Sequence, residues 1–518
     1  MKKLNYIAIV TGLFLFMSSC QDFLDENVID SVSVDYVYTT PTGIETGVNA
    51  LYNLHREYNF PSRTQDGLRN WVFFRVGTDL GLSRAWWIPY NPQSMTPLNF
   101  PSLYWRQAYQ ILDRANAIVS NARNVDMDID KKNELIAQAR LVRGETYFNL
   151  LRAYDNILLD TIATTSDNVF DEVDYTPANP DDVYRLIDSD FDFAIKHLSW
   201  DNDYGKFGQG MARHLRGQSA MWQGDWDEAV IQFDAIVESG RYKLLDNIGQ
   251  VFGQNANHSE AIMVYPRNEA LSGEVYLAGG DFHQLPGLFV ARWYEIPTKE
   301  VIRSVENGGQ VMGWEYPNSY LQSLYDPEVD KRFETYYYPL KLFVNNPDKP
   351  NYGEPLPESS YPDNYRQYHW SLKKFHDINK SITGNQSYKD MIRYRYAETL
   401  LLGAEAHWRA SGENATDTKA LEYINLVRER AGVPDFETFD QEKYLEESAR
   451  ELAFEGNRWF LLKRMGLLVE RQNLHYRRGG NSNSETTEPM PAYMVRLPIP
   501  QSQIDLMGGV FPQNQGYE

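Results

Sequence analysis

A run of aromatic and polar residues at positions 84–91 is the part of the sequence best suited to bind a ligand. It reads Arg-Ala-Trp-Trp-Ile-Pro-Tyr-Asn and places Trp86 directly before Trp87. Successive side chains of an extended segment point in opposite directions, so two adjacent tryptophans cannot both face one core. Prolines at positions 89 and 92 favour a loop. We therefore expect at least one exposed indole, with the alternative that both rings fill a gap between helices.

Exposed rings of this kind can hold a sugar. A sugar's C–H face lies well on an aromatic plane, and Trp and Tyr keep a polar group for hydrogen bonding. Such a site also needs a few polar side chains that orient the ligand. We predict a ligand site whose members are Trp86, Trp87, Tyr90, Asn91, Asp79, Arg75, Tyr294 and Trp314. Core packing is an equal alternative for Tyr294 and Trp314. Arg75, Asp79 and Asn91 could instead be ordinary solvated surface residues.

Motifs of known catalytic chemistry are missing from the sequence. It has no His-Glu-x-x-His, no Gly-x-Ser-x-Gly and no Walker loop, and its nine histidines are scattered. The run Asp126–Asp130 alternates aspartates as a calcium loop does, but Lys131 and Ala137 stand where such a loop needs Gly and Glu. An acidic helix start explains this run better. We predict a binding protein without a cofactor; calcium remains an alternative. A glycoside hydrolase also remains open, because carboxylates are abundant.

The first residues have the layout of a secretion signal that ends in a lipid anchor. Two lysines precede an apolar stretch at residues 6–17, and two serines and Cys20 follow. Cys20 is the single cysteine of the chain and lies where bacterial lipoprotein signals place the acylated residue. We expect a signal peptide at residues 1–19, a lipidated tether at residues 20–40 and one domain at residues 41–518.

The formal net charge of −21 limits the possible partners. Nucleic-acid binding needs clustered Lys and Arg that neutralise phosphates, so we expect no nucleic-acid partner. Anionic membrane surfaces also attract basic rather than acidic segments. Attachment to a membrane would instead come from acyl chains, which contribute about 0.8 kcal/mol for each buried methylene.

Apolar residues recur every three or four positions in much of the chain, which predicts amphipathic helices. The clearest case is residues 212–239, where Gly224 and Asp225 interrupt the pattern and indicate a helix–turn–helix pair. Gly217 and Phe233 have the spacing of a tetratricopeptide unit, in which a small residue admits a large one. Further helices are predicted at residues 44–56, 103–123, 135–154, 183–198, 394–409, 418–432 and 444–465.

Two segments, residues 60–102 and 245–390, lack this periodicity. They are rich in Pro, Gly, Asn, Asp and aromatic residues, which favours irregular structure with a few strands. Loops on a rigid scaffold often carry binding residues. The predicted fold class is therefore mainly α, a scaffold of tetratricopeptide-like helix pairs with long irregular insertions that carry the ligand site.

Several segments resemble the SusD/RagB family of outer-membrane nutrient-binding lipoproteins. The most specific are RYRYAETLLLGAEAHW at 393–408, INLVRERAG at 424–432 and ELAFEGNRWFLLKRMG at 451–466. The ends of the expected mature chain, CQDFLDE at 20–26, LPIP at 497–500 and QNQGY at 513–517, are also similar. The sequence departs from the family pattern at Leu461, where an acidic residue is expected, and at Gln515, where Pro is commoner.

This resemblance implies an α-helical fold with four tetratricopeptide-like pairs and a lid-like seat on a SusC-like TonB-dependent transporter. It also implies a ligand-contacting Trp, followed shortly by an Asn, in the loop of Trp86 and Trp87, and further aromatic contacts near Tyr294 and Trp314. The expected function is capture of a glycan at the cell surface, by a protein lipid-anchored to the outer membrane and facing outside. A peptide receptor is the alternative, because some relatives take peptides.

Overall fold

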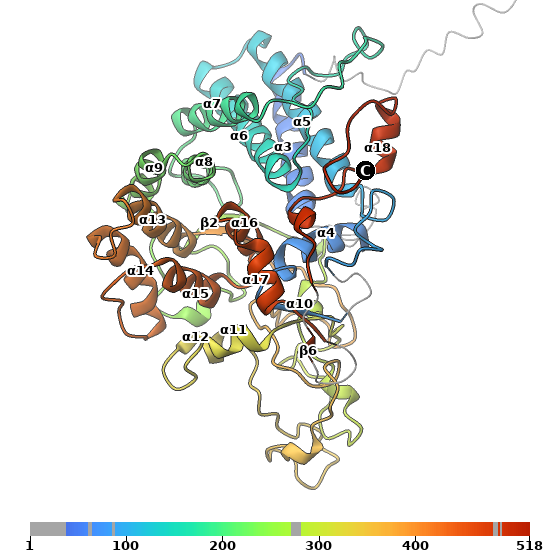
Figure 1. The fold of residues 1–518 in the computed structure, drawn as a ribbon, viewed down its shortest axis with the longest axis vertical. Coiled ribbons are helices and arrows are strands. Elements are labelled where there is room, and N and C mark those ends of the chain that lie inside the picture. The colour runs from blue at the N-terminus through green and yellow to red at the C-terminus, as the bar shows by residue number, and fades with distance from the viewer. Residues whose placement is uncertain (1–37, 61–64, 85–88, 271–280, 480–484, 487–488) are drawn as a thin grey trace, which may run out of the picture.

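The computed structural model describes residues 38–60, 65–84, 89–270, 281–479, 485–486 and 489–518. Helices dominate the described chain and follow one another from the top of Figure 1 down its left side. Segments with little regular structure fill the lower right of that view. The predicted fold class, mainly α with long irregular insertions, is confirmed.

Eight of the described helices pack as four pairs, α3 with α5, α6 with α7, α8 with α9, and α13 with α14. Their bounds are α3 Pro41–Asn59, α5 Leu103–Asn121, α6 Ile129–Ala153, α7 Pro180–His197, α8 Gln209–Gln223, α9 Trp226–Glu238, α13 Tyr396–Ala410 and α14 Thr418–Ala431. The third pair turns where the sequence predicts. Gly224 ends α8 with a left-handed φ of 76°, and the Asp225 side chain caps α9 by accepting the backbone N–H of Glu228.

The same contact between a glycine and an aromatic ring joins three of these pairs. A glycine of the first helix faces a ring of the second, Gly144 against Phe191, Gly217 against Phe233 and Gly403 against Tyr423. A Cβ added to these glycines would lie 2.8, 2.7 and 2.9 Å, respectively, from the ring. These distances are below van der Waals contact, so glycine is what lets the helices approach and bury the ring. The contact predicted between Gly217 and Phe233 thus recurs in two other helix pairs.

The single helix predicted at residues 444–465 is wrong. The segment forms α15 (Gln441–Leu452) and α16 (Arg458–Arg464), and α17 (Leu468–His475) follows. Between α15 and α16, Phe454 and Gly456 adopt positive φ angles of 66° and 114°, which no helix accepts. The Lys374 ammonium holds this break open by donating to the carbonyl oxygens of residues 451 and 453. A partner 80 positions away therefore overrides the local helical pattern.

One helix, α4 (Gln65–Val76), lies inside the segment that was predicted to be irregular. Four consecutive side chains, Trp71 to Phe74, are all buried. Because both sides of α4 are covered, its sequence has no polar face and no helical period. Among the described residues, no helix combines the length and the apolar character needed to cross a membrane.

The irregular insertions contribute short strands and helices. A four-stranded sheet has the order β3-β1-β5-β6, and a second sheet pairs β2 with β4. The strands are β1 Gly81–Ser83, β2 Ala261–Tyr265, β3 Glu315–Pro317, β4 Met391–Arg395, β5 Arg477–Gly479 and β6 Glu485–Thr486. The remaining helices are α10 Leu285–Leu288, α11 Ser319–Ser323, α12 Lys331–Thr335 and α18 Gln501–Leu506, with 3₁₀ turns at Ala122–Asn124, Ile248–Gln250, Trp293–Glu295, Glu358–Ser360 and Ala492–Val495.

A buried ionic cluster ties these insertions to the C-terminal helices. Glu451 of α15 is 0% exposed and receives hydrogen bonds from Arg332 at 3.1 Å and Arg395 at 2.7 Å. Arg430 of α14 pairs with the same carboxylate. Burial disfavours the charged form, but Arg430, Arg395 and Arg332 together hold the pKa of Glu451 well below its usual value. The family-like segment at 451–466 therefore has a structural role here.

Candidate functional site

The pairing of β1 with β3 brings two parts of the predicted site together. Ser83 lies opposite Glu315 in this antiparallel pair. One residue further, the backbone N–H of Arg84 donates to the carbonyl oxygen of Trp314 at 3.0 Å. The segment that leads to Trp86 and Trp87 therefore starts beside Trp314, whose indole is half-buried. Residues 85–88 lie outside the described part of the chain, so the exposure of Trp86 and Trp87 stays a prediction.

Tyr294 belongs to the same region. Its hydroxyl donates to the carbonyl oxygen of Val311 at 3.2 Å, three positions before Trp314. The guanidinium of Arg303 lies over the Tyr294 ring, 4.3 Å from its centre. Tyr294 is half-buried, like Trp314. Tyr294 and Trp314 thus lie near one backbone segment, although the Trp314 side chain packs against the main core and the Tyr294 side chain against a second, smaller cluster.

A cluster of charged side chains lies next to these rings, and sequence analysis missed most of it. Arg366 makes a two-point contact with Glu295, at 2.8 and 2.9 Å, and Arg292 donates to the same carboxylate at 2.9 Å. Glu295 lies slightly buried, which works against its charge, but Arg366 and Arg292 lower its pKa below the usual value. All three side chains are half-buried, so they offer fixed N–H donors and carboxylate acceptors to a ligand. The only sequence signal was the Arg292-Trp293-Tyr294 run.

The prediction that Asp79 and Tyr90 contact the ligand is wrong. Asp79 is 0% exposed and forms ion pairs with Arg458 at 2.7 Å and Arg471 at 3.3 Å. The Tyr90 side chain is also buried; its hydroxyl donates to the carbonyl of Gly77. Both side chains are committed to the interior, where they anchor the chain on either side of residues 81–88.

Arg75 is corrected for the same reason, and Asn91 is only partly available. The Arg75 side chain is buried on α4 and points into the interior rather than to the surface. Asn91 is half-buried, and its side-chain oxygen accepts the backbone N–H of Gln93 at 2.9 Å. This turn shapes the chain after the Trp86–Trp87 segment, so a direct contact of Asn91 with a ligand stays a prediction.

The aspartate run at Asp126–Asp130 caps a helix. The Asp128 side chain accepts the backbone N–H groups of Asp130 and Lys131 at the start of α6, at 3.1 and 3.0 Å. In the part of the chain that the structure describes, no group of three or more His, Cys, Asp and Glu side chains is placed to hold a metal ion.

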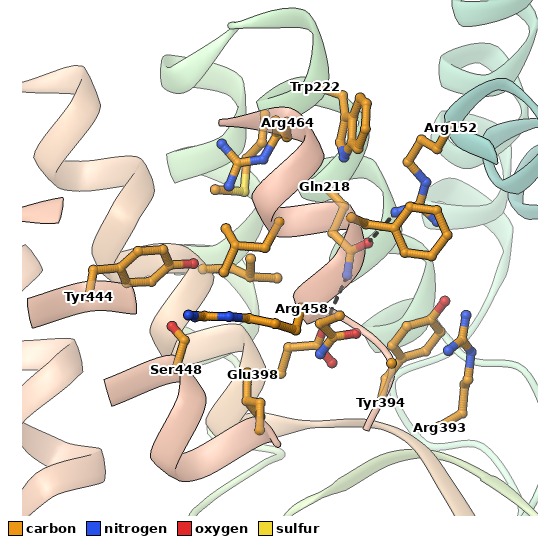
Figure 2. Close-up of a pocket in the computed structure, with 17 residues that line it drawn as sticks. Arg152, Gln218, Trp222, Arg393, Tyr394, Glu398, Tyr444, Ser448, Arg458 and Arg464 are labelled. Carbon is orange, nitrogen blue, oxygen red and sulfur yellow. Dashed lines mark hydrogen bonds between the residues drawn. The ribbon is translucent and has the colours of Figure 1, made fainter. Parts of the chain in front are cut away.

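A pocket between scaffold helices, drawn in Figure 2, is one competing concave feature. Its walls come from α6, α8, α13, α15 and α16 and include Arg152, Trp222 and Arg464. Arg464 pairs with Glu405 at 2.6 Å inside the protein, whereas Arg152 bonds to neutral oxygens. The volume is about 60 Å³, enough for a few water molecules at about 10–15 Å³ each. An oligosaccharide does not fit there.

Larger hollows of about 650 and 300 Å³ lie beside Asn202 and Lys206. The surface beside Trp314 is the candidate site because of its aromatic side chains, not because of a pocket.

Comparison with known proteins identifies the family. A model of the SusD family matches residues 342–517, which include the predicted C-terminal motifs. A SusD-like protein P2 of Formosa agariphila is 24% identical over the full length of both chains. Residues 342–517 of the protein thus match the SusD family, and SusD-like relatives align along the whole chain. The recognition made from the sequence is thereby confirmed.

Further similar proteins are also SusD or SusD-like. The starch-binding protein SusD of Bacteroides thetaiotaomicron is 32% identical over 25% of this chain and 22% of its own. Among solved structures, a laminarin-binding SusD-like protein has a TM-score of 0.71 and 23% identity, covering 93% of this chain and 100% of the other. A surface glycan-binding protein A of B. thetaiotaomicron in complex with laminarihexaose has a TM-score of 0.70 and 21% identity, covering 92% and 100%. These solved structures establish the fold.

Proposed function

We propose that this protein captures a glycan at the cell surface and delivers it to a TonB-dependent transporter of the outer membrane. The observation that carries the proposal is the half-buried indole of Trp314 beside the start of the Trp86–Trp87 segment. Relatives described as binding starch and laminarin support a saccharide ligand.

The chemistry of the site suits a saccharide. An indole face offers an apolar platform for a sugar ring, and aromatic packing of this kind contributes about 0.5–1.5 kcal/mol beyond area burial. The Arg366–Glu295–Arg292 cluster supplies charged donors and acceptors, whose hydrogen bonds to neutral hydroxyl groups are stronger than those of neutral side chains. These side chains hold one another in place, so little rotamer freedom is lost when a sugar binds.

The same charges favour binding over hydrolysis. A glycosidase needs one carboxyl group with a raised pKa to protonate the leaving oxygen. The two arginines beside Glu295 lower its pKa instead, so it stays ionised at neutral pH and cannot serve as that acid. We therefore propose that the protein binds its glycan without cleaving it.

Attachment to the membrane is assigned to Cys20, which lies outside the described residues. Acylation of Cys20 would hold the domain at the outer membrane through a tether of residues 20–40.

Cell fractionation tests the anchor: Cys20→Ala should move the protein from the membrane fraction to the soluble fraction. Co-purification of the wild-type protein with a transporter, from cells grown on the glycan, tests the delivery step.

Titration calorimetry with laminarin, starch and a peptide library tests the ligand. We expect a measurable heat of binding with one of the glycans. Trp314→Ala should weaken the affinity for that glycan about tenfold, the equivalent of one aromatic contact. Trp222→Ala, in the pocket of Figure 2, is the matched control and should keep its affinity within about twofold of wild type. Binding to peptides alone, or an unchanged affinity in Trp314→Ala, would contradict the proposal.

A further inference from the structure

Arg75 is a buried arginine that has no carboxylate partner among the described residues. Its side chain is 6% exposed, and the described residues give it one hydrogen bond, from Nη1 to the carbonyl oxygen of Trp71 at 3.4 Å. Its Nε–H has no partner. Other buried arginines of this chain, such as Arg332 and Arg395, each pair with carboxylates. Arg75 therefore differs from them in chemistry as well as in place.

Arg75 keeps its positive charge inside the protein. Burial lowers the pKa of Arg75 well below its usual value, and the nearby positive charge of Arg393 lowers it further. An arginine nevertheless stays protonated at neutral pH. The guanidinium lies over the rings of Phe60 and Trp71, at 5.1 and 4.3 Å, which compensates an isolated buried charge only in part. Such a charge destabilises a fold unless a counter-ion accompanies it.

A small cavity lies directly at this guanidinium. Its volume is about 30 Å³ and its lining includes Arg75, Arg393, Trp71, Asn70 and Tyr104. At about 10–15 Å³ for a water molecule, this is room for two or three waters or for one monatomic anion. Polyatomic anions such as sulfate or an amino-acid carboxylate need more room.

Several hydrogen-bond donors of the cavity walls are unused. Within the described part of the chain, the Nε–H groups of Arg75 and Arg393 and the indole N–H of Trp71 are buried and have no partner, and the same holds for one acceptor, the side-chain oxygen of Asn70.

Arg393 does contact Glu145 at 3.3 Å, but that carboxylate is shared with His55 at 2.7 Å and with the hydroxyl of Tyr394 at 2.7 Å. The Glu145 carboxylate thus already has other partners, and Glu398 is a second negative charge near Arg393.

The surroundings add positive charge. Arg152, which Figure 2 shows on the same side of the neighbouring pocket as Arg393, is also buried and bonds only to neutral oxygens. Burial lowers its pKa to about 10, and Arg393 contributes to that shift. Gly456 completes the wall, because a Cβ there would lie 3.1 Å from the Arg75 guanidinium carbon. The close approach of backbone and guanidinium thus depends on a glycine.

We propose that this cavity binds one monatomic halide ion, chloride under physiological conditions, held by the guanidinium of Arg75 and the N–H groups of Arg393 and Trp71. The ion neutralises Arg75 and links α4 to the break between α15 and α16. Because α4 leads into β1 and the Trp86–Trp87 segment, the bound ion fixes the base of the candidate glycan site. The proposal does not depend on which ligand that site takes.

Thermal unfolding of the full mature chain tests the proposal. At constant ionic strength, replacing sodium gluconate by sodium chloride should raise the Tm by about 2–3 °C at a hundredfold excess over Kd. Arg75→Leu should remove the chloride response. Arg185→Leu, at a side chain that is 74% exposed, is the matched control and should keep it. A chloride response that survives in Arg75→Leu would overturn the assignment.

A second measurement on wild-type protein keeps the test valid should Arg75→Leu fail to fold. Crystals grown with sodium bromide should show an anomalous peak within hydrogen-bond distance of the Arg75 guanidinium. Water alone in the cavity, or a Tm that responds equally to gluconate and chloride, would contradict the proposal.

Discussion

The helical scaffold and the irregular insertions of this protein are held together in different ways. The scaffold repeats one local contact, a glycine of one helix against an aromatic ring of the next, as Gly217 and Phe233 show. The insertions depend on contacts between distant residues, such as Ser83 opposite Glu315 and the ion pairs of Glu451. The difference teaches that the scaffold is specified by sequence period, whereas the surface beside Trp314 exists only once distant segments meet.

Removing the central carboxylate of the ionic cluster should have the largest effect. Glu451→Ala leaves Arg332, Arg395 and Arg430 with less negative charge in the interior. We expect a loss of about 3–5 kcal/mol in the free energy of unfolding, the usual cost of breaking a buried ion pair on one side. Urea denaturation measures it. Glu413→Ala, at a carboxylate that is 54% exposed, is the control and should change stability by at most about 1 kcal/mol.

Filling a glycine of the scaffold should have an intermediate effect. In Gly217→Ala the new Cβ would meet the Phe233 ring at 2.7 Å, and overpacking of this kind costs about 1–3 kcal/mol. The double variant Gly217→Ala/Phe233→Leu should recover part of that loss, because a smaller side chain frees the space. Glycan affinity of the folded fraction should not change. If the double variant were no more stable than Gly217→Ala alone, the explanation that Gly217 makes room for the Phe233 ring would be contradicted.

Acidity should have the smallest effect, and only at the ligand site. The arginines lower the folded-state pKa of Glu295, so its ion pairs persist even as the pH falls past the ordinary Glu pKa and are lost only as it falls through the lowered pKa. Glycan affinity should therefore be constant between about pH 8 and pH 5 and weaken below about pH 4.3, the reference value for Glu. Titrations of wild type and Glu295→Gln across this range check it. A decline that begins at neutral pH would contradict the role given to Glu295.

Most of the scaffold could be predicted from the sequence because its helices carry their own signals. The interruption at Gly224 and Asp225 and the period of residues 212–239 are local patterns, and the structure confirms them. The helix α4 was missed because all its sides are covered, which removes the period. The break at Gly456 was missed because its cause, Lys374, is distant in sequence.

The site was harder to predict, for a physical reason. Aromatic residues suggest a sugar platform by type alone. The structure places Tyr294 and Trp314 near one backbone segment but buries Tyr90, so the platform stays a prediction.

Polar residues carry no such signal. Asp79 was mistaken for a ligand contact because its partners, Arg458 and Arg471, are nearly 400 positions away. Arg366 and Glu295 were missed for the same reason, since only folding brings them together.

The most direct test of the central claim is a crystal structure of the mature protein with a bound glucan such as laminarihexaose. The account predicts a sugar ring lying on the Trp314 indole, with hydroxyl groups bonded to the Arg366–Glu295–Arg292 cluster. A saccharide seated elsewhere, with Trp314 free of contact, would contradict it.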